Sequence, residues 1–571
     1  MDKQDTKYIF VTGGVCSGLG KGITVAALGR LLKARGFKVT IQKLEPYLNM
    51  NPGLLSPYQH GEVYVTEDGA EVDLDLGHYE RFVDENLGVN NSVSAGKIYW
   101  EVLNKDRKGV YQGATVQIIP HITDAIKERI CLASKDAGCD IIISEIGGTV
   151  GDIESLPFIE AIRQISQDKG YENVMYIHLA LVPYLSFADE MKTKPVQNSV
   201  KDLLSLGIKP DAIVCRTEHS MTTEMREKLA MFCNVNIDCV IENLNVSSTY
   251  DVPLLLEEEN FADIVCRRLG IESPAPDLAE WKALVNRAKK ITDEITIALV
   301  GKYTEFRDSY LSVIEAVKHA GIALNTNINI KWVNARELDD KTVNKHLSGV
   351  SGIIMPGGYG QNGVDGLITA AKYARKKKIP FFGIGLGMQC ALLEFARNVM
   401  GLEDAASAEE NPNAETPIFE YIDRQAERVT GEKPAMRLGA QHCKLTPGSH
   451  LQAAYGEDQV YERFRHLCKL NNAFRAEFIR HGIVESAVSH DDKYVEAIEL
   501  PASVHPWFVG VQFRPEFKSR ITRPSLIFKA FLAACMKQVE KAIASLPEGS
   551  RVELGSTERR GLGQRPIKND V

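Results

Sequence analysis

A glycine-rich stretch near the amino terminus has residue types and spacing that suit phosphate binding. It reads Thr-Gly-Gly-Val-Cys-Ser-Gly-Leu-Gly-Lys-Gly over residues 12–22, between an apolar β-type run and a helical pattern. In such a loop, backbone N–H groups, the helix dipole and a lysine attract phosphate oxygens. The strict pattern G-x-x-x-x-G-K-S/T fails twice, at Val15 and at Gly22. A nucleotide site is one interpretation, and a tight turn with a solvated lysine is the other.

Carboxylates further along the chain suit a metal ion that accompanies a nucleotide. Asp73 and Asp75 alternate with apolar residues, so on a strand both would lie on one face. Glu145 ends a buried-strand run, and parallel sheets bind ligands at the carboxyl ends of their strands. Because Mg²⁺ on a nucleotide is usually held by one or two carboxylates plus phosphates, Asp75 and Glu145 are candidate ligands. A solvated strand face explains Asp73 and Asp75 equally well from the pattern alone.

Two lysines at a predicted helix start, Lys192 and Lys194, suit a second anionic ligand, although a solvated basic turn explains them as well.

The elements that would position these side chains alternate between strands and helices. Apolar runs at 8–11 and 38–43 flank a helical pattern, which predicts a βαβ unit and a parallel sheet. The alternation breaks near 271–276 and restarts with a new strand at 295–301. We therefore expect an α/β fold of two domains, each a mainly parallel sheet flanked by helices. The expected boundaries are 1–270 and 295–540, with a linker at 271–294 and a disordered tail at 541–571.

Composition excludes several classes of protein. The 571 residues are 44% hydrophobic and 25% charged, without the roughly 18 consecutive apolar residues of a membrane helix. The polar start is unlike a signal peptide, so a cytoplasmic protein that does not bind membranes is expected. Eleven cysteines without C-x-x-C pairs indicate neither a disulfide framework nor a zinc site. The net charge of −8 argues against nucleic acid as a main partner.

Several long stretches make the chain resemble the CTP synthase family from Lys7 to about Cys535. The stretches that carry the resemblance lie at 10–23, 56–63, 73–82, 147–158 and 192–195. The resemblance implies an amidoligase domain that binds ATP and UTP, phosphorylates the uracil O4 and lets ammonia displace phosphate at C4. It also implies Mg²⁺ as cofactor and a homotetramer.

The resemblance assigns roles residue by residue. Lys21 and Lys43 are the expected catalytic residues, and Asp75 and Glu145 would carry Mg²⁺. ATP would be bound by Gly14, Ser17, Gly18, Leu19, Gly20, Lys21, Gly22, Ile23 and Asp75. UTP would be bound by Ser17, Lys192, Lys194, Gln197 and Lys228. The cytosine ring of inhibitory CTP would be bound by Asp152, Ile153 and Glu154.

Small departures from the family pattern occur within this first domain. Gly18 replaces a usual serine and Glu45 replaces an aspartate, while Met50-Asn51 replaces a Val-Asp pair. The usual Thr-Gln-His reads Val-Gln-Asn at 196–198. These changes leave the phosphoryl-transfer residues intact but could reshape the site where the amine arrives.

The second domain resembles class I glutamine amidotransferases but lacks the residues for their chemistry. The family frame Gly-Ile-Cys-Leu-Gly reads Gly-Ile-Gly-Leu-Gly at 383–387, so Gly385 replaces the nucleophilic cysteine. The frame His-Pro-Glu reads Arg-Pro-Glu, so Arg514 replaces the base while Glu516 is kept. Thiol activation needs such a base. Cys390 lies in the following helical pattern and is expected to be a core residue.

Supporting residues of the glutamine site have also changed. Gly358 of the Pro-Gly-Gly oxyanion strand is kept, but Asn362 and Leu467 stand where the family has arginines. Loss of nucleophile, base and two arginines together indicates a natural pseudo-glutaminase. Because the arginine at 362 is tied to GTP activation in the family, we expect no activation by GTP.

Three functions remain open at this point. The leading one is an ATP-dependent ligase that aminates UTP with free ammonia, or with another amine such as aspartate to give an N4-substituted CTP. In that version the former glutaminase pocket is the entrance and Arg514 holds a carboxylate. The second is a non-catalytic paralogue that regulates an active CTP synthase. Ordinary glutamine-dependent synthesis, the third, would need a replacement nucleophile that the sequence does not offer.

Overall fold

A computed structural model of the chain describes residues 6–16, 18–423 and 436–544. These residues form two compact units. Unit 1 consists of the described residues of Met1–Leu54 and Glu71–Val285, and unit 2 of those of Leu55–Ala70 and Asn286–Val571. Residues 55–70, which the sequence placed within the first expected domain, therefore belong to unit 2.

Unit 1 is built on a sheet of seven parallel strands. Because both faces are covered, the strands are near-continuous apolar runs such as Ile141–Ile146. In spatial order they are β11 (Val240–Leu244), β10 (Ala212–Thr217), β7 (Val174–Leu181), β1 (Lys7–Gly14), β6 (Ile141–Ile146), β2 (Val39–Glu45) and β5 (Ser92–Ser94). Short strands lie outside this sheet at β4 (Glu71–Val72), β8 (Tyr184–Leu185) and β9 (Glu190–Met191).

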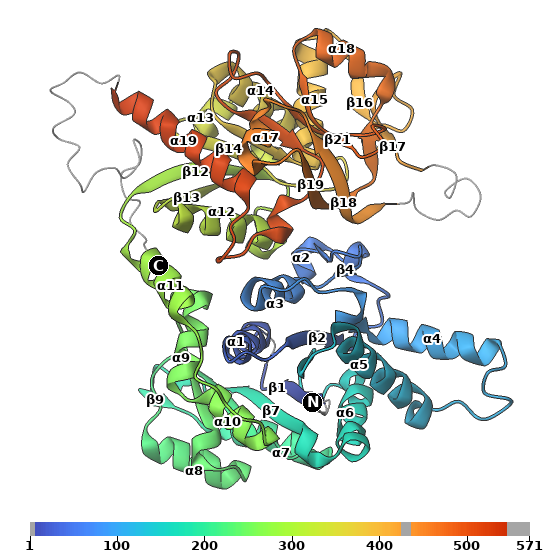
Figure 1. Cartoon of the computed structure of the whole chain (residues 1–571), viewed down its shortest axis with the longest axis vertical. Coiled ribbons are helices and arrows are strands. Elements are labelled where there is room, and N and C mark those ends of the chain that lie inside the picture. The colour runs from blue at the N-terminus through green and yellow to red at the C-terminus, as the bar shows by residue number, and fades with distance from the viewer. Residues whose placement is uncertain (1–5, 17, 424–435, 545–571) are drawn as a thin grey trace. The chain divides into compact units, whose positions relative to one another are not determined.

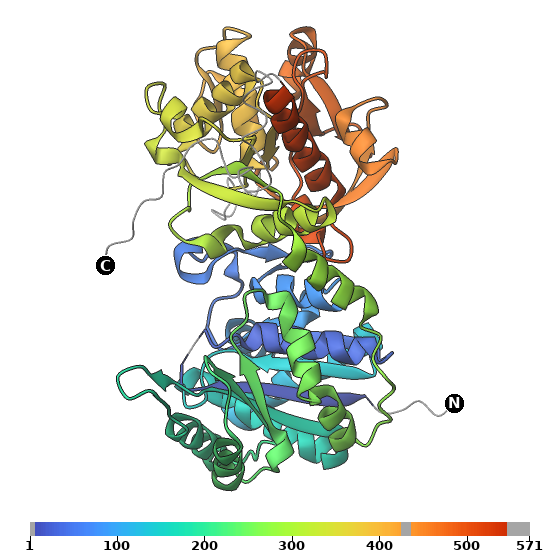
Figure 2. The same ribbon diagram turned by 90° about the vertical axis from the view of Figure 1, so that its left-hand side faces the viewer.

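Helices cover both faces of this sheet (Figures 1 and 2). One face carries Phe10 and Ile142 in a core shared with α5 and α6, and α1, α3 and α9 pack together against the other. The helices are α1 (Lys21–Ala34), α3 (Asp75–Val83), α4 (Ala95–Arg107), α5 (Thr123–Ala137), α6 (Leu156–Lys169), α7 (Lys194–Ser205), α8 (Thr223–Cys233), α9 (Val252–Glu258), α10 (Phe261–Leu269) and α11 (Ala279–Lys290).

Unit 2 contains a mixed sheet of nine strands. Its first five strands are parallel and the rest antiparallel, because short connections such as that at 490–494 allow only antiparallel neighbours. In order they are β13 (Asn327–Asn334), β12 (Glu294–Gly301), β14 (Gly352–Met355), β15 (Phe381–Ile384), β23 (Phe508–Val511), β22 (Val495–Glu499), β21 (Val484–Ser489), β18 (Arg437–Leu445) and β19 (Gln459–His466). The expected α/β class is thus confirmed, with a second sheet that is mixed rather than mainly parallel.

A smaller sheet and several helices complete unit 2. The sheet contains β16 (Ala405–Ser407), β17 (Thr416–Tyr421) and β20 (Cys468–Leu470), and β3 (Tyr64–Val65) lies in the early segment. The helices are α2 (Pro57–His60), α12 (Leu311–Ala323), α13 (Val343–Leu347), α14 (Val364–Lys377), α15 (Leu386–Asn398), α17 (His450–Tyr455), α18 (Arg475–Arg480) and α19 (Leu526–Ala544).

Two features bear on the expected boundaries. The segment interpreted as a linker contains α11, whose Trp281 is fully buried and donates from Nε1 to the carbonyl oxygen of Tyr250 at 2.9 Å. The last helix, α19, runs to Ala544, and the expected tail beyond it lies outside the described residues. No helix in the described part of the chain is long and apolar enough to cross a membrane.

Candidate active site

In the described part of the glycine-rich loop between β1 and α1, the backbone is left-handed at three positions. Left-handed φ angles of 79°, 74° and 80° occur at Val15, Gly18 and Gly20. Turns of this kind direct backbone N–H groups into one concavity, where phosphate oxygens are natural acceptors. Lys21 begins α1 and donates from Nζ to the carbonyl oxygen of Gly148 at 2.7 Å. Ser17, expected to contact both nucleotides, lies outside the described residues.

Two glycines of this loop make room for neighbouring side chains. A Cβ atom at Gly22 would lie 2.3 Å from Oδ1 of Asp75, and one at Gly14 would lie 1.5 Å from Oγ of Ser199. Only glycine therefore lets α1 approach Asp75 and lets the end of β1 approach α7. Of the other expected ATP contacts, Leu19 is buried and Ile23 is partly exposed.

Lys43, on β2, is the centre of a buried cluster of charges. Its Nζ lies 2.5 Å from Oδ2 of Asp75 and 2.7 Å from Oε1 of Glu145. Strand register explains one contact, because Lys43 pairs with Glu145 on the neighbouring strand β6. The hydroxyl of Tyr79 donates to the second oxygen of Glu145 at 2.5 Å. Burial alone would lower the pKa of Lys43, but Asp75 and Glu145 outweigh it and hold that pKa well above its usual value.

The structure corrects the interpretation of Asp73 and Asp75 as neighbours on one strand face. Strand β4 ends at Val72, and α3 begins at Asp75. Oδ1 of Asp73 accepts a hydrogen bond from the backbone N–H of Asp75 at 3.0 Å, which supports the start of the helix. Asp73 therefore stabilises the start of α3, whereas Asp75 pairs with Lys43. Burial would raise the pKa of Asp75, but the ammonium of Lys43 outweighs it and lowers that pKa.

Asp75 and Glu145 fit the role of magnesium ligands. Each has a carboxylate oxygen, the kind of ligand that Mg²⁺ prefers, within hydrogen-bond distance of Nζ of Lys43. Asp75 also packs against Gly22 of the glycine-rich loop. Mg²⁺ needs only one or two carboxylates when phosphates and water complete its shell. Within the described ranges, no three His, Cys, Asp or Glu side chains are grouped to hold a metal by themselves. This donor set therefore suits a metal that arrives with a nucleotide.

Glu45 reaches the same cluster from the end of β2. Its Oε1 lies 3.9 Å from Nζ of Lys43, and a Cβ atom at Gly147 would lie 2.7 Å from its Oε2. Burial raises the pKa of Glu45 to about 8. The side chain therefore lies between Lys43 and the loop that begins at Gly147.

The expected UTP-binding lysines line one cavity in unit 1. Its volume is about 560 Å³, and its lining includes Lys192, Lys194 and Lys228 together with Tyr184 and His219. Such a volume suits a nucleotide-sized ligand. The amide of Gln197 instead donates to Oγ1 of Thr193 at 3.2 Å, and Gln197 does not line the cavity.

The residues expected to bind the cytosine ring of CTP lie in the loop after β6. Oδ2 of Asp152 accepts from the backbone N–H of Thr149 at 2.8 Å, which shapes the loop. Ile153 is 82% exposed, an unusual state for a large apolar side chain. Glu154 follows it in a short 3₁₀ turn. The loop therefore presents an apolar side chain rather than burying it.

In unit 2, a sharp turn at Gly385, which we call the elbow, joins β15 to α15. Gly385 has φ 53° and ψ −109°, and its N–H donates to the carbonyl oxygen of Val511 at 2.7 Å. A Cβ atom at Gly385 would meet only the Cα of Gly357, at 3.7 Å, so the space for a side chain remains. Cys390 is fully buried within α15, where burial raises the pKa of its thiol to about 12. Cys390 is therefore a core residue, as expected.

Arg514 is held by two buried carboxylates. Its Nε donates to Oε1 of Glu516 at 2.5 Å, and its Nη2 lies 3.8 Å from Oε1 of Glu62. A Cβ atom at Gly357 would lie 3.0 Å from Nη1 of Arg514, so the guanidinium packs against this glycine. The charge of Arg514 is thus already satisfied within the protein.

The cavity at the elbow is too small for an amino acid. Its volume is about 10 Å³, roughly what one water molecule needs. Tyr359 and Arg465 stack across it with 4.6 Å between guanidinium carbon and ring centre. The other lining residues are Gly357, Gly358, Gly385, Leu386, Gln389, Glu409, His466, Leu467 and Arg514.

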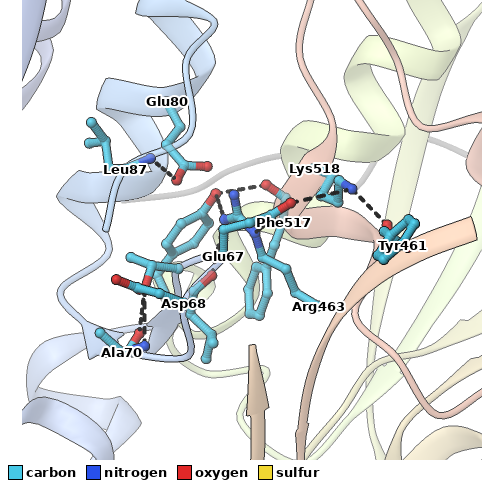
Figure 3. A network of polar contacts seen from close by, with 12 residues as sticks. Glu67, Asp68, Ala70, Glu80, Leu87, Tyr461, Arg463, Phe517 and Lys518 are labelled. Atoms are coloured by element: carbon cyan, nitrogen blue, oxygen red, sulfur yellow. Dashed lines mark hydrogen bonds and ion pairs between the residues drawn. The ribbon is translucent and has the colours of Figure 1, made fainter. Parts of the chain in front are cut away.

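Contacts with Arg463 and Phe517 hold residues 55–70 to the rest of unit 2 (Figure 3). Arg463, fully buried, donates from Nε to Glu67 at 2.7 Å and from Nη1 to the hydroxyl of Tyr64 at 3.0 Å. The hydroxyl of Tyr64 donates to the carbonyl oxygen of Phe517 at 2.7 Å. Glu62 accepts from the backbone N–H of Ser312 at 2.9 Å.

Sequence reasoning missed two residues of these sites. Tyr79 lies four positions after Asp75, hence on the same face of α3, a spacing that could have identified it. Glu62 gave no such signal, because its partners come from residues about 250 and 450 positions away.

Comparisons with known proteins cover nearly the whole chain. Residues 7–271 match the CTP synthase N-terminus family, and residues 305–534 match the class-I glutamine amidotransferase family. A CTP synthase of Ruminiclostridium cellulolyticum is 55% identical over 540 residues, which is 94% of this chain and 100% of that protein. A CTP synthase of Clostridium kluyveri is 53% identical over 538 residues, again 94% and 100% of the two chains.

Among solved structures, the glutaminase domain of Trypanosoma brucei CTPS with bound acivicin is 36% identical. The match covers 43% of this chain and 94% of that one, with a TM-score of 0.40.

Proposed function

Because the chain belongs to the CTP synthase family, we propose that it activates UTP with ATP and aminates it with nitrogen supplied from outside. The nitrogen source is ammonia or another small amine. Glutamine is not hydrolysed by this chain, and its second unit is a pseudo-glutaminase.

The charged cluster of unit 1 supports the phosphorylation step. A carbonyl oxygen is a poor leaving group, and transfer of a phosphoryl group to the uracil O4 makes it a good one. Such a transfer needs charge neutralisation and alignment more than covalent help. Lys21 and the loop N–H groups would hold the ATP phosphates, and Lys43 would lie at the transferred group. Mg²⁺, held by Asp75 and Glu145, would neutralise phosphate charge.

The single observation that carries the proposal is the state of the former glutamine site. Glycine stands at the elbow, the ion-paired Arg514 stands where a base is needed, and the cavity has about the volume of one water molecule. A guanidinium does not deprotonate at neutral pH, so Arg514 cannot act as a base.

The same geometry bears on the amine donor. Entry of an amino acid through the former glutamine pocket, with Arg514 holding its carboxylate, is not favoured, because Glu516 and Glu62 already pair with Arg514. Free ammonia is therefore the simplest donor. An amino-acid donor such as aspartate would need a different route. The complete cluster around Lys43 argues against a purely regulatory paralogue.

The test is phosphate release from ATP in the presence of UTP and Mg²⁺, with glutamine, ammonium chloride or single amino acids as donors. The nucleotide product is identified by mass. We expect turnover with ammonium and none with glutamine alone. A product heavier than CTP with one amino acid would replace ammonia by that donor. Glutamine-dependent turnover would refute the proposal. Absence of phosphate release with every donor would favour the regulatory paralogue.

A further inference from the structure

Transfer of a phosphoryl group from ATP to UTP requires close alignment of the two nucleotides. When two reactants are held in the correct geometry, a displacement of about 1 Å can cost about 100-fold in rate. The glycine-rich loop is expected to hold ATP, and the lysines at the start of α7 are expected to hold UTP. This need for alignment follows from the proposed function, in which both nucleotides are bound at once. The contact that fixes α7 against the loop therefore bears on the reaction.

The end of β1 lies between Lys21 and α7. Its last two residues are Gly13 and Gly14, and successive residues of a strand face opposite sides of the sheet. A Cβ atom at Gly13 would lie 2.6 Å from Cδ of Lys21. A Cβ atom at Gly14 would lie 1.5 Å from Oγ of Ser199 on α7. The stem of the expected ATP lysine and the hydroxyl of Ser199 therefore pack on the same strand end.

A buried chain of hydrogen bonds holds Ser199 in this position. Nε2 of His178, on β7, lies 2.8 Å from Oγ of Ser199. Nδ1 of the same ring lies 2.9 Å from Oγ1 of Thr12 on β1, the residue that pairs with His178 in the parallel register of the two strands. The exposed fractions of His178, Thr12 and Ser199 are 0%, 1% and 6%, so water does not compete for these bonds.

A neutral imidazole suits this chain of bonds. It offers one N–H donor and one lone pair, and each of the two hydroxyls can either donate or accept a hydrogen bond. Burial and the nearby ammonium of Lys21 lower the pKa of His178 to about 4, so the ring is neutral at neutral pH. Both ring nitrogens are therefore bonded without a charge on the ring.

Ser199 lies close to the lysines expected to bind UTP. It is five positions after Lys194, the first residue of α7, and hence about 7.5 Å further along the helix axis. Lys194 and Lys192 both line the cavity of about 560 Å³. Packing of Ser199 on Gly14 prevents movement of α7 toward β1, and the bond to His178 opposes movement away. The position of α7 relative to the glycine-rich loop is thus fixed in both directions.

We propose that His178 is a positioning residue for phosphoryl transfer and acts through Ser199. It keeps α7, with the lysines expected to bind UTP, at a fixed distance from the loop expected to bind ATP. In the step that it aligns, a bond forms between the uracil O4 and the γ-phosphorus of ATP. The bond from that phosphorus to the bridging oxygen breaks, and ADP leaves with its electron pair.

The test separates the bond to Ser199 from the bond to Thr12. The amide of a glutamine can reach the position of Nε2, whereas that of an asparagine reaches only the position of Nδ1. His178→Gln therefore keeps the bond to Ser199, and His178→Asn loses it. With ATP, UTP, Mg²⁺ and ammonium chloride, we expect kcat for phosphate release to fall about 10- to 100-fold in His178→Asn. In His178→Gln it should stay close to that of wild type.

Two further measurements separate positioning from a general structural role. Ser199→Ala removes a single oxygen atom and should lower kcat as much as His178→Asn, and the two changes combined should lower it no further. ATP affinity, measured by calorimetry, should change far less than kcat, because the interaction lost is one that matters in the transition state. Ser134→Ala, which removes a buried hydroxyl from α5, is the matched control.

The proposal is overturned if His178→Asn and Ser199→Ala keep the kcat of wild type, or if His178→Gln loses as much as His178→Asn. It is also overturned if ATP affinity falls as far as kcat. Absence of turnover in wild type with every amine would instead refute the proposed function, so the two failures are distinguishable.

Discussion

Nε of Arg514 lies 2.5 Å from Oε1 of Glu516, in an ion pair buried beside a glycine elbow. In the proposed function, Arg514 stands where the family frame His-Pro-Glu has its histidine, and the carboxylate of that frame is kept at Glu516. Here the carboxylate is kept but binds a permanent cation, whose other face approaches Glu62 at 3.8 Å. We therefore propose that Glu516 is half of an ion pair with Arg514 and not the orienting acid of a glutaminase.

Restoring the thiol and the imidazole should not restore the glutaminase. In the variant Gly385→Cys with Arg514→His, we expect no glutamate release from glutamine, because Leu467 still stands where the family has an arginine that contacts glutamine. Glutamate is measured by enzyme-coupled assay, with ammonium-dependent turnover as the control for an intact synthase. Glutamate release by this double variant would show that the remaining pocket is competent.

Removing the Arg514 guanidinium should destabilise unit 2. Arg514→Met leaves Glu62 and Glu516 buried without their cation, at a cost of about 3–5 kcal/mol. Native-state hydrogen exchange of peptides covering 508–518 reports the local stability. The triple variant Glu62→Gln, Arg514→Met, Glu516→Gln should recover most of the loss. Lys493→Met, which breaks a surface ion pair with Asp491, is the matched control. Equal protection in Arg514→Met and wild type would contradict the account.

Glu62 should make the stability of unit 2 depend on pH. Burial raises its pKa to about 7, against 4.5 as its ordinary value, although Arg514 opposes the shift. Between these values the native state binds more protons than the unfolded state, so the unfolding free energy falls as pH rises. Relative to Glu62→Gln, wild type should lose roughly 3 kcal/mol between about pH 4 and pH 8.

The comparison with Glu62→Gln isolates this group. Buried His466 and His505, with pKa values lowered to about 3 and about 4, give the opposite dependence but occur in both proteins. Urea unfolding at a series of pH values measures the difference. If the difference in unfolding free energy between wild type and Glu62→Gln stayed constant with pH, the pKa of Glu62 would not be raised.

Lys43 should be needed for phosphorylation rather than for nucleotide binding. Lys43→Met removes the ammonium between Asp75 and Glu145, and we expect UTP-dependent phosphate release to fall about 100- to 1,000-fold. ATP binding, measured by calorimetry, should fall much less because the glycine-rich loop remains. Lys127→Met serves as control, since this lysine pairs with Asp168 away from the cluster. If Lys43→Met released phosphate as fast as wild type, Lys43 would have no role in phosphorylation.

Formation of the expected homotetramer should depend on α4 and on the segment that follows it, residues 108–119. Trp100 and Leu103 on α4 are 56% and 55% exposed, and Val110 and Ile119 are 56% and 52% exposed. Large apolar side chains left exposed on a helix and on the segment after it are typical of interaction surfaces. We expect a homotetramer, and Trp100→Asp with Leu103→Asp should shift it to smaller species in analytical ultracentrifugation. Ile479→Asp, equally exposed in unit 2, should not. A tetramer insensitive to the α4 changes would move the interface elsewhere.

Local patterns predicted the elements better than the contacts between them. Apolar runs predicted strands β1, β2, β6 and β12 within a few residues. A strand that is buried on both faces consists of consecutive apolar residues, so its position can be read from the sequence. The pairing of Asp73 with Asp75 on a strand was wrong, since a single hydrogen bond at a helix start overrides alternation. The assignment of residues 55–70 to unit 2 depends on Arg463 and Phe517, far along the chain, which no local pattern reveals.

The candidate site could be predicted only in part. The strand pattern proposed Asp75 and Glu145, the family resemblance added Lys43, and the structure brings the three together around one ammonium. The place of Glu45 in that cluster follows from the register of β2 and from the missing side chain at Gly147. The roles of Lys192, Lys194, Gln197 and Lys228 toward UTP stay predictions.

The origin of the transferred nitrogen tests the central claim most directly. Wild type is supplied with ATP, UTP, Mg²⁺, glutamine carrying ¹⁵N in its amide group and unlabelled ammonium chloride, and the mass of the nucleotide product is measured. We predict that the product contains only unlabelled nitrogen and forms at a rate that glutamine does not change. Product containing ¹⁵N would show that the elbow at Gly385 still serves a working glutaminase and would contradict the account.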